Sequence, residues 1–335
     1  MVIKHLVISG GGPCGFLNYG AVKESNLQKL WKYENIKSIY ATSAGAIISL
    51  PIILNLEWEW IDDYFIKRPW QNVIKLNKSD YFKLMKDKGL INKDEFMDKL
   101  IGPLLQSADL SINTTLKELY EKFPIEFHIH TLNMNEDYGN QLVNISYKTH
   151  PDLLIKDAIY MTASVPLLFK PIIKEYGCFI DGGLLANIPL DTCVEEVKCN
   201  LNEILVIKCN RKIENSKILE TTGIWSYLID LFSIFSNNLL LISEKYNLEK
   251  YKNVLVLEPH CDKREYVTSL NYWLEVLNSS DERSMLVESG VNYVKNIIKD
   301  KQFQHNILNY SINDIKEDYK QYFYKKNIIK RSYSF

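Results

Sequence analysis

Three short segments, far apart in the chain, hold residue types whose spacing suits hydrolytic chemistry. Ser43 stands in Ala41-Thr42-Ser43-Ala44-Gly45, Asp181 begins Asp181-Gly182-Gly183, and a glycine-rich loop runs from Gly10 to Gly15. A serine hydroxyl attacks a carbonyl carbon efficiently only when a base accepts its proton and donors stabilise the oxyanion that forms. We therefore expect Ser43 to be the nucleophile, Asp181 the base and the glycine loop the source of donors.

The nucleophile needs a sharp turn between a strand and a helix. A β-rich run over 36–41 ends just before Ser43, and a small-to-apolar helical pattern begins at Ala44. Such an elbow presents the hydroxyl at the carboxyl end of a sheet and directs the N–H groups of the helix start toward the group attacked. Gly45 supplies one small residue of the G-x-S-x-G pattern, and Ala41 stands where its leading glycine would be.

The glycine loop follows an apolar strand pattern over 2–9 and precedes a helical pattern over 16–31. Proline has no N–H, so Pro13 cannot donate. The candidate oxyanion donors are the main-chain N–H groups of Gly10, Gly11, Gly12, Cys14 and Gly15.

The Asp181 segment follows a short strand pattern over 178–180, and Gly182 and Gly183 allow a tight turn that brings the main chain close to the serine. An Asp-Gly pair alone is equally typical of an exposed turn. Beside Ser43 and the glycine loop, we favour the interpretation as a base, which requires partial burial of the carboxylate.

In this order, the glycine loop, the serine elbow and the Asp-Gly-Gly segment resemble the patatin-like phospholipase family over roughly residues 1 to 210. The resemblance implies a lipid acyl hydrolase, of phospholipase A type or a related carboxylic ester hydrolase. It also implies a serine–aspartate dyad without a histidine, an acyl-enzyme intermediate, and glycine-loop amides as the oxyanion hole. The family's loop pattern G-G-G-x-[KR]-G has a basic residue where this chain has Cys14. We expect that departure to affect head-group preference more than hydrolysis. No metal or organic cofactor is implied, and the expected partner is an acyl lipid or phospholipid substrate.

Two further blocks also resemble the family and contain no obvious reactive group. They are Thr162-Ala163-Ser164-Val165-Pro166 and Asn187-Ile188-Pro189. We expect Pro166 and Pro189 to fix the main chain on either side of the Asp181 loop, and Asn187 to hydrogen-bond across it.

The fold class implied is a three-layer α/β/α arrangement with a mostly parallel central sheet. We expect a catalytic domain over 1–210, with a helical insertion at about 57–123, and a mostly helical extension over 211–335 packed on the same domain. The sequence patterns predict adjacent strands at 125–132 and 141–147 and further strands at 203–209 and 253–257. They also predict a loop between the Thr162 block and the strand at 178–180. Helices are expected over 92–101, ended by Gly102-Pro103, and at 114–123, 152–161, 190–198, 223–248, 282–299 and 314–324.

Three alternatives remain open. The loop also matches the dinucleotide fingerprint G-x-G-x-x-G, but the strand before Ser43 ends without the carboxylate that a ribose would need. A Ser-His-Asp esterase would need a histidine after Asp181, and His260 follows a predicted strand. The departures at Cys14 and Ala41 also allow a non-catalytic lipid-binding protein.

Composition is that of an ordinary globular protein. The chain has 335 residues, 40 basic and 41 acidic, so its net charge of −1 gives no general attraction to nucleic acid. Six cysteines without C-x-x-C spacing favour reduced thiols, and the first apolar run is too short for a secretory signal, so we expect a cytoplasmic protein. The tail after Tyr324 combines Lys325, Lys326, Lys330 and Arg331 with aromatic and aliphatic residues, which suits transient contact with an anionic membrane surface.

Overall fold

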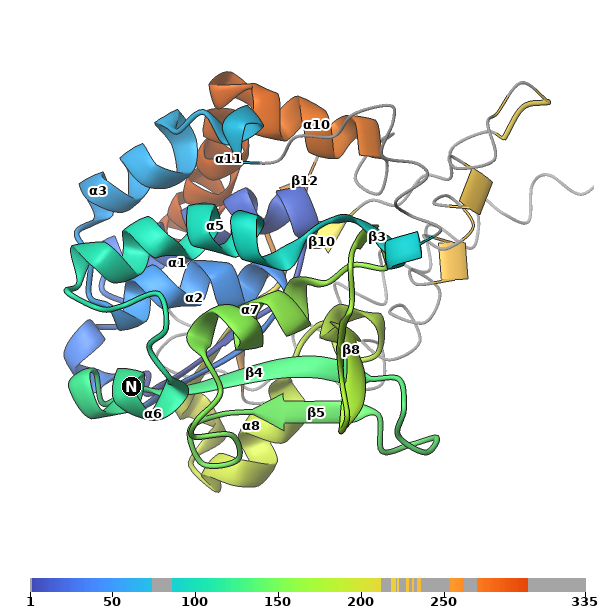
Figure 1. Cartoon of the computed structure of the whole chain (residues 1–335). Coiled ribbons are helices and arrows are strands. Elements are labelled where there is room, and N and C mark those ends of the chain that lie inside the picture. Colours follow the sequence, from blue (N-terminus) through green and yellow to red (C-terminus); the bar gives the residue numbers. More distant parts are fainter. Residues whose placement is uncertain are drawn as a thin grey trace, which may run out of the picture.

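An eight-stranded sheet lies at the centre of the molecule (Figure 1). The computed structural model describes residues 2–73, 86–211, 254–261 and 270–300, together with a few separate positions between 218 and 235. The strands of this sheet are β1 (His5–Ile8), β2 (Ser38–Thr42), β4 (Glu126–Asn133), β5 (Leu142–Ile145), β7 (Ile172–Lys174), β8 (Gly177–Asp181), β9 (Ile204–Ile207) and β11 (Leu255–Leu257).

The sheet is mostly parallel. Its order is β11-β9-β1-β2-β4-β8-β7, with β5 paired to β4. The first five strands of this order run parallel to one another, whereas β5 and β8 are antiparallel to β4, and β7 is antiparallel to β8. The predicted adjacency of the strands near 125–132 and 141–147 is therefore confirmed.

Side chains on the central strands alternate between two cores, because successive residues of a strand point to opposite faces. In β1, Leu6 and Ile8 belong to the larger core, whereas Val7 belongs to a smaller one. The same alternation in β2 places Ile39 on the first face and Tyr40 on the second. Both faces of the sheet are thus apolar and must be covered by helices.

Helices cover both faces (Figure 1). The larger core receives buried side chains from α1 (Gly15–Leu27), α2 (Ala44–Ile53), α5 (Lys93–Ser107), α6 (Leu116–Lys122), α7 (Ile155–Ala163) and α11 (Ser280–Lys299). The smaller core is covered by α8 (Leu190–Val197), through Leu190 and Cys193. This arrangement confirms the expected three-layer α/β/α class.

The region expected as a helical insertion is mostly helical in its described part. It contains α3 (Trp58–Asp62), a π-helical turn η3 (Asp63–Lys67), a short 3₁₀ turn η4 (Trp70–Asn72), α5 and α6. It also contributes a strand, β3 (Gly89–Ile91), which pairs in parallel with β6 (Leu167–Phe169). The segment between the Thr162 block and the predicted strand at 178–180 was expected to be a loop, and this is wrong, because it contains β6 and β7. The predicted strand itself is β8.

The predicted end of a helix at Gly102-Pro103 is also wrong, since α5 continues to Ser107. Pro103 lacks the N–H that would bond to the carbonyl of Lys99. The Nη2 group of Arg68 donates to that carbonyl instead, at 2.7 Å. The hydroxyl of Tyr64 donates to the next carbonyl, that of Leu100. Side chains of Arg68 and Tyr64 thus supply hydrogen bonds to the helix carbonyls around the proline.

Two C-terminal helices pack on this body. They are α10 (Leu270–Asn278), which the sequence patterns did not predict, and α11, which lies along α1. A short parallel pair joins β10 (Asn210–Arg211) to β12 (His260–Cys261). The predicted helix at 223–248 lies largely outside the described residues, and the helix at 314–324 and the basic tail lie wholly outside them. The division at residue 210 stays a prediction.

Candidate active site

The register of the sheet brings Ser43 and Asp181 together. β2 runs parallel to β4 as far as the pair Thr42–His130, and β8 runs antiparallel to β4 up to the pair Asp181–Thr131. Because β5 occupies the other edge of β4, β2 and β8 approach each other end to end along one edge. The residues at their carboxyl ends are therefore neighbours.

The hydroxyl of Ser43 donates a hydrogen bond to Oδ2 of Asp181 at 2.6 Å, across 138 positions of sequence. The other carboxylate oxygen, Oδ1, accepts from the N–H of Gly183 at 2.7 Å. Both side chains are almost fully buried, with 6% and 4% of their residue surfaces exposed. The carboxylate is thus oriented by the turn that follows it and directed at the serine.

Ser43 adopts a main-chain conformation that non-glycine residues rarely take, with φ 52° and ψ −126°. Such a conformation costs about 1–3 kcal/mol and persists only where surrounding contacts hold it. The N–H of Ser43 donates to Oγ1 of Thr162 at 2.8 Å, and that hydroxyl donates in turn to the carbonyl of His130. The Thr162 block was expected to be scaffolding, and the hydrogen bond between Thr162 and the Ser43 N–H was not predicted.

Small residues are required around the elbow. A side-chain carbon at Gly45 would lie 2.4 Å from the carbonyl oxygen of Ile8, and one at Gly15 would lie 2.9 Å from the Cβ of Ala44. Ala41, which replaces the leading glycine of the pattern, is fully buried in the larger core. The chain therefore accommodates a methyl group at position 41, whereas at position 45 β1 leaves no space for one.

The N–H groups of the glycine loop divide into two sets. Those of Gly10, Cys14 and Gly15 donate within the main chain, to the carbonyls of Asn187, Gly11 and Gly12 respectively. Within the described part of the chain, no hydrogen bond is recorded for the N–H groups of Gly11 and Gly12. Of the five donors predicted, these two are therefore the remaining candidates, and Gly12 lines the cavity beside Ser43.

Asn187 links the glycine loop to the Asp181 turn. Its carbonyl accepts from the N–H of Gly10. Its Oδ1 would lie only 2.6 Å from a side-chain carbon placed at Gly10. The same oxygen would lie 3.2 Å from a side-chain carbon at Gly183. Asn187 thus lies between the glycine loop and the Asp181 turn, and the hydrogen bond of its side chain across the Asp181 loop stays a prediction. Pro166 lies between α7 and β6, just after Ser164, whose carbonyl accepts from the N–H of Asp181.

Ser9 is a further supporting residue that the sequence patterns did not single out. Its hydroxyl donates to the carbonyl of Gly10 and accepts from the N–H of Cys209 and the amide of Asn18. Asn18 also donates to the carbonyl of Ser9. This buried network fixes the start of the glycine loop to α1 and to the chain after β9.

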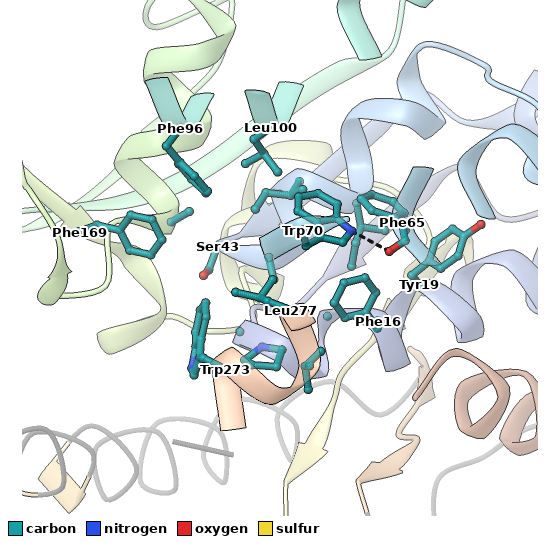
Figure 2. Close-up of a pocket in the computed structure, with 18 residues that line it drawn as sticks. Phe16, Tyr19, Ser43, Phe65, Trp70, Phe96, Leu100, Phe169, Trp273 and Leu277 are labelled. Atoms are coloured by element: carbon teal, nitrogen blue, oxygen red, sulfur yellow. Dashed lines mark hydrogen bonds between the residues drawn. The ribbon is translucent and has the colours of Figure 1, made fainter. Parts of the chain in front are cut away.

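An apolar cavity of about 110 Å³ opens beside Ser43. Figure 2 shows Ser43 between Phe96 and Phe169 on one side and Trp273 on the other. The lining residues are mostly aromatic or aliphatic: Gly12, Pro13, Gly15, Phe16, Tyr19, Ser43, Ala44, Ile47, Ile48, Phe65, Trp70, Phe96, Leu100, Ala163, Phe169, Trp273, Val276 and Leu277. Such a cavity suits the hydrocarbon part of a ligand.

Partners other than Ser43 are recorded for the side chains of His128, His130 and His260. His260 is exposed and its ring contacts Tyr293. His128 lies between Glu126 and Glu196, and His130 bonds to Thr192. Within the described residues, the recorded partner of the Ser43 hydroxyl is Asp181.

One group of possible metal ligands, His5, Cys199 and Glu203, occurs in the described part of the chain. His5 opens β1 and Glu203 immediately precedes β9, so the group lies at the amino ends of these strands, opposite the edge that carries Ser43. Lys4 already forms an ion pair with Glu203 at 2.7 Å, and a cation there disfavours a metal ion. The absence of a metal stays a prediction.

Comparison with known proteins gives a family match over this site. The model of the family described as patatin-like phospholipase matches residues 6–194. That range contains the glycine loop, Ser43 and Asp181, and it ends before α10.

Two viral relatives are similar in sequence. "Probable lipid hydrolase 463L" of Invertebrate iridescent virus 6 is 24% identical over 286 residues, which are 85% of this chain and 89% of that protein. "Uncharacterized protein R571" of Acanthamoeba polyphaga mimivirus is 27% identical over 188 residues, 56% of this chain and 60% of that protein. The chain therefore matches less than two thirds of the length of the mimivirus protein.

Among solved structures, VipD from Legionella pneumophila is similar at a TM-score of 0.42, with 16% identity, 86% of this chain covered and 67% of that chain. The type III effector ExoU is similar at a TM-score of 0.36, with 12% identity, over 88% of this chain and 53% of that chain.

Among the described residues, none of the helices combines the length and hydrophobicity that crossing a bilayer requires.

Proposed function

Because this chain belongs to the patatin-like phospholipase family, we propose that it is a lipid acyl hydrolase that cleaves carboxylic esters through a Ser43–Asp181 dyad. The substrate class is an acyl lipid or a phospholipid. The observation that carries this proposal is the hydrogen bond of 2.6 Å from the Ser43 hydroxyl to a buried carboxylate at the end of β8. The relative named as a probable lipid hydrolase supports the same class of substrate.

In the first step the Ser43 oxygen attacks the ester carbonyl carbon while its proton passes to Oδ2 of Asp181. The carbonyl oxygen becomes an oxyanion, for which the N–H groups of Gly11 and Gly12 are the proposed donors. Collapse of this intermediate expels the alcohol, which takes the proton from Asp181, and leaves an acyl-serine. Water then attacks the acyl-serine while Asp181 accepts its proton, and the serine oxygen takes that proton back as it leaves, which releases the fatty acid and restores the dyad.

The cavity supports an apolar acyl group as the part of the substrate nearest to Ser43. Its wall carries Ser43 and Ala44 from the elbow and Gly12 from the loop. A carbonyl group at Ser43 would therefore have the proposed oxyanion donors on one side and apolar surface along its chain. This placement suits a hydrophobic acyl ester better than a polar one.

Hydrolysis of nitrophenyl esters and of phospholipid vesicles by the purified chain tests this proposal. We expect activity on both, and its loss in Ser43→Ala and in Asp181→Asn. Asp137 lies in an exposed loop, and Asp137→Asn is the matched control that should keep wild-type activity. Absence of hydrolysis by the folded wild-type chain, or full activity of Ser43→Ala, contradicts the proposal. Lipid binding without hydrolysis would favour a non-catalytic protein.

A further inference from the structure

The wall of the cavity beside Ser43 is completed by a helix outside the family match. The matched range ends at residue 194, whereas Trp273, Val276 and Leu277 of α10 line the cavity. Figure 2 shows Trp273 on one side of Ser43, facing Phe96 and Phe169 across it. The part of the chain that is common to the family therefore does not close this cavity alone.

The ring of Trp273 also covers the glycine loop. Gly12 has φ +53°, and a side-chain carbon placed there would lie 2.6 Å from Cζ2 of Trp273. The three atoms nearest to that position all belong to the indole ring. A glycine with a positive φ can relax easily into other conformations. The Trp273 ring restricts the conformational freedom of Gly12, whose N–H is one of the two candidate oxyanion donors.

A second contact joins the same loop to the same helix. Cys14, at the end of the 3₁₀ turn η1 (Gly12–Cys14), is fully buried in a cluster that includes Tyr272 and Val276 of α10. This is the position where the family pattern has a basic residue, and a charged side chain would not suit an apolar cluster. The replacement by cysteine is thus compatible with α10 packing against the loop.

The position of α10 is fixed by a buried arginine. Arg283, on α11 and 2% exposed, donates from Nη1 to the carbonyls of Val276 and Leu277 at the end of α10. Its Nε and Nη2 groups donate to the carbonyl of Ile66, and Nη2 also to that of Arg68. Phe65 and Trp70 lie in the same segment as the acceptors Ile66 and Arg68, and both line the cavity. Arg283 therefore ties together two walls of the cavity.

We propose that Trp273 is both a positioning and a specificity-determining residue. Its ring holds Gly12 so that the loop N–H groups face the oxyanion, and the same ring limits the space for the acyl chain beside Ser43. The chemical class concerned is an ester of a single apolar acyl chain. The inference rests on the proposed function, since both effects presuppose attack by Ser43.

The two effects can be separated by acyl chain length. A nitrophenyl acetate has too short an acyl group to fill the cavity, so it reports on the oxyanion loop. Longer nitrophenyl esters, with the same leaving group, report also on the size of the cavity. Leu277 lines the same cavity one turn further along α10. Leu277→Ala is therefore the comparison variant, because it enlarges the cavity without removing the ring over Gly12.

We expect Trp273→Ala to lower kcat about 10-fold or more on every ester, including the acetate, because loss of one oxyanion donor costs about 10²- to 10³-fold and a displaced donor somewhat less. Leu277→Ala should lower kcat on the acetate less than Trp273→Ala does, because the ring over Gly12 stays in place. Both variants should shift the chain-length optimum of kcat/KM toward longer acyl groups. Trp273→Phe, which keeps an aromatic ring, should recover most of the lost kcat.

Equal kcat on the acetate for Trp273→Ala and Leu277→Ala overturns the positioning role. An unchanged chain-length optimum in both overturns the specificity role. Thermal unfolding of each variant verifies the fold, and Trp273→Leu takes the place of Trp273→Ala if the latter does not fold. A wild-type chain that neither hydrolyses the esters nor reacts with a fluorophosphonate contradicts the proposed function itself. That outcome is distinct from failure of the Trp273 variants in an active enzyme.

Discussion

The Ser43 hydroxyl and the Asp181 carboxylate lie 2.6 Å apart because β2 and β8 end against each other along one edge of β4. Neither residue depends on a flexible loop for its position. Each is the last residue of a strand or the first after it, and β4 sets the register of both.

Thr162 should be needed for the conformation of Ser43. Its hydroxyl accepts from the Ser43 N–H and donates to the His130 carbonyl. Thr162→Val keeps the shape but leaves both groups without this partner, so we expect kcat to fall about 10-fold or more, since small displacements of reacting groups are costly. Thr162→Ser retains the hydroxyl and should stay close to wild type in the nitrophenyl ester assay. Equal loss in both variants would indicate that packing, not the hydroxyl, matters.

Gly45 and Gly102 offer a matched pair of glycine substitutions. A methyl group at Gly45 would collide with the carbonyl of Ile8, whereas at Gly102 the nearest atom is 4.0 Å away, on the side chain of Ile112. Gly45→Ala should lower the free energy of unfolding by about 1–3 kcal/mol or more, as overpacking does. Gly102→Ala, within α5, should raise it by about 0.5–1 kcal/mol. Denaturation in urea measures both, and a change of the same sign in the two variants would contradict this account.

Arg283 should contribute strongly to stability. Its guanidinium is buried and donates to four main-chain carbonyls, two near the end of α10, that of Ile66 within η3 and that of Arg68 just after η3. Arg283→Met removes these donors and leaves buried acceptors unsatisfied, which should cost about 3–5 kcal/mol. Lys295→Met, at an exposed position of the same helix, should change stability by less than about 0.5 kcal/mol. Comparable urea midpoints for the two variants would refute the role assigned to Arg283.

Two buried histidines predict how stability depends on pH. Burial lowers the pKa of His5 to about 4 and that of His130 to about 3. Both pKa values are below the unfolded value of about 6.5, so below that pH the unfolded chain binds protons that the folded chain does not. The free energy of unfolding should therefore fall from about pH 6.5 to about pH 4, by up to about 1.4 kcal/mol per pH unit for each histidine.

Urea denaturation at several pH values between 7.5 and 4.5 measures this slope. His130→Gln removes one of the two groups and should show a shallower decline with falling pH than wild type. Identical slopes for the two chains would mean that His130 does not stay neutral in the fold.

Sequence patterns located the three segments of the candidate site, because glycine loops, elbows and Asp-Gly turns have strong local signatures. The pairing of β4 with β5 followed from strand patterns, whereas the three-layer class followed from the family resemblance of the motifs. The continuation of α5 past Pro103 could not be predicted, since it depends on Arg68 and Tyr64 from a segment about 30 residues earlier. Local propensity alone ends a helix at such a proline.

The supporting contacts of the site were hidden for the same reason. Thr162 and Trp273 have no reactive group, and their importance appears only when α7 and α10 are placed against the elbow and the loop. The glycine loop was predicted to offer five N–H donors, and the structure engages three of them within the main chain. The N–H of Gly10 is engaged by the carbonyl of Asn187, a contact that spacing in the sequence does not give, and those of Cys14 and Gly15 are engaged by the turn of the loop itself.

The most direct test of the dyad is the rate at which a fluorophosphonate probe labels the chain, with the modified peptide identified by mass spectrometry. Only an activated serine reacts. The account predicts a single adduct on Ser43, none in Ser43→Ala, labelling about 10²-fold slower or more in Asp181→Asn, and wild-type labelling in Asp137→Asn. Labelling of Asp181→Asn at the wild-type rate, or an adduct on a different serine, would contradict it.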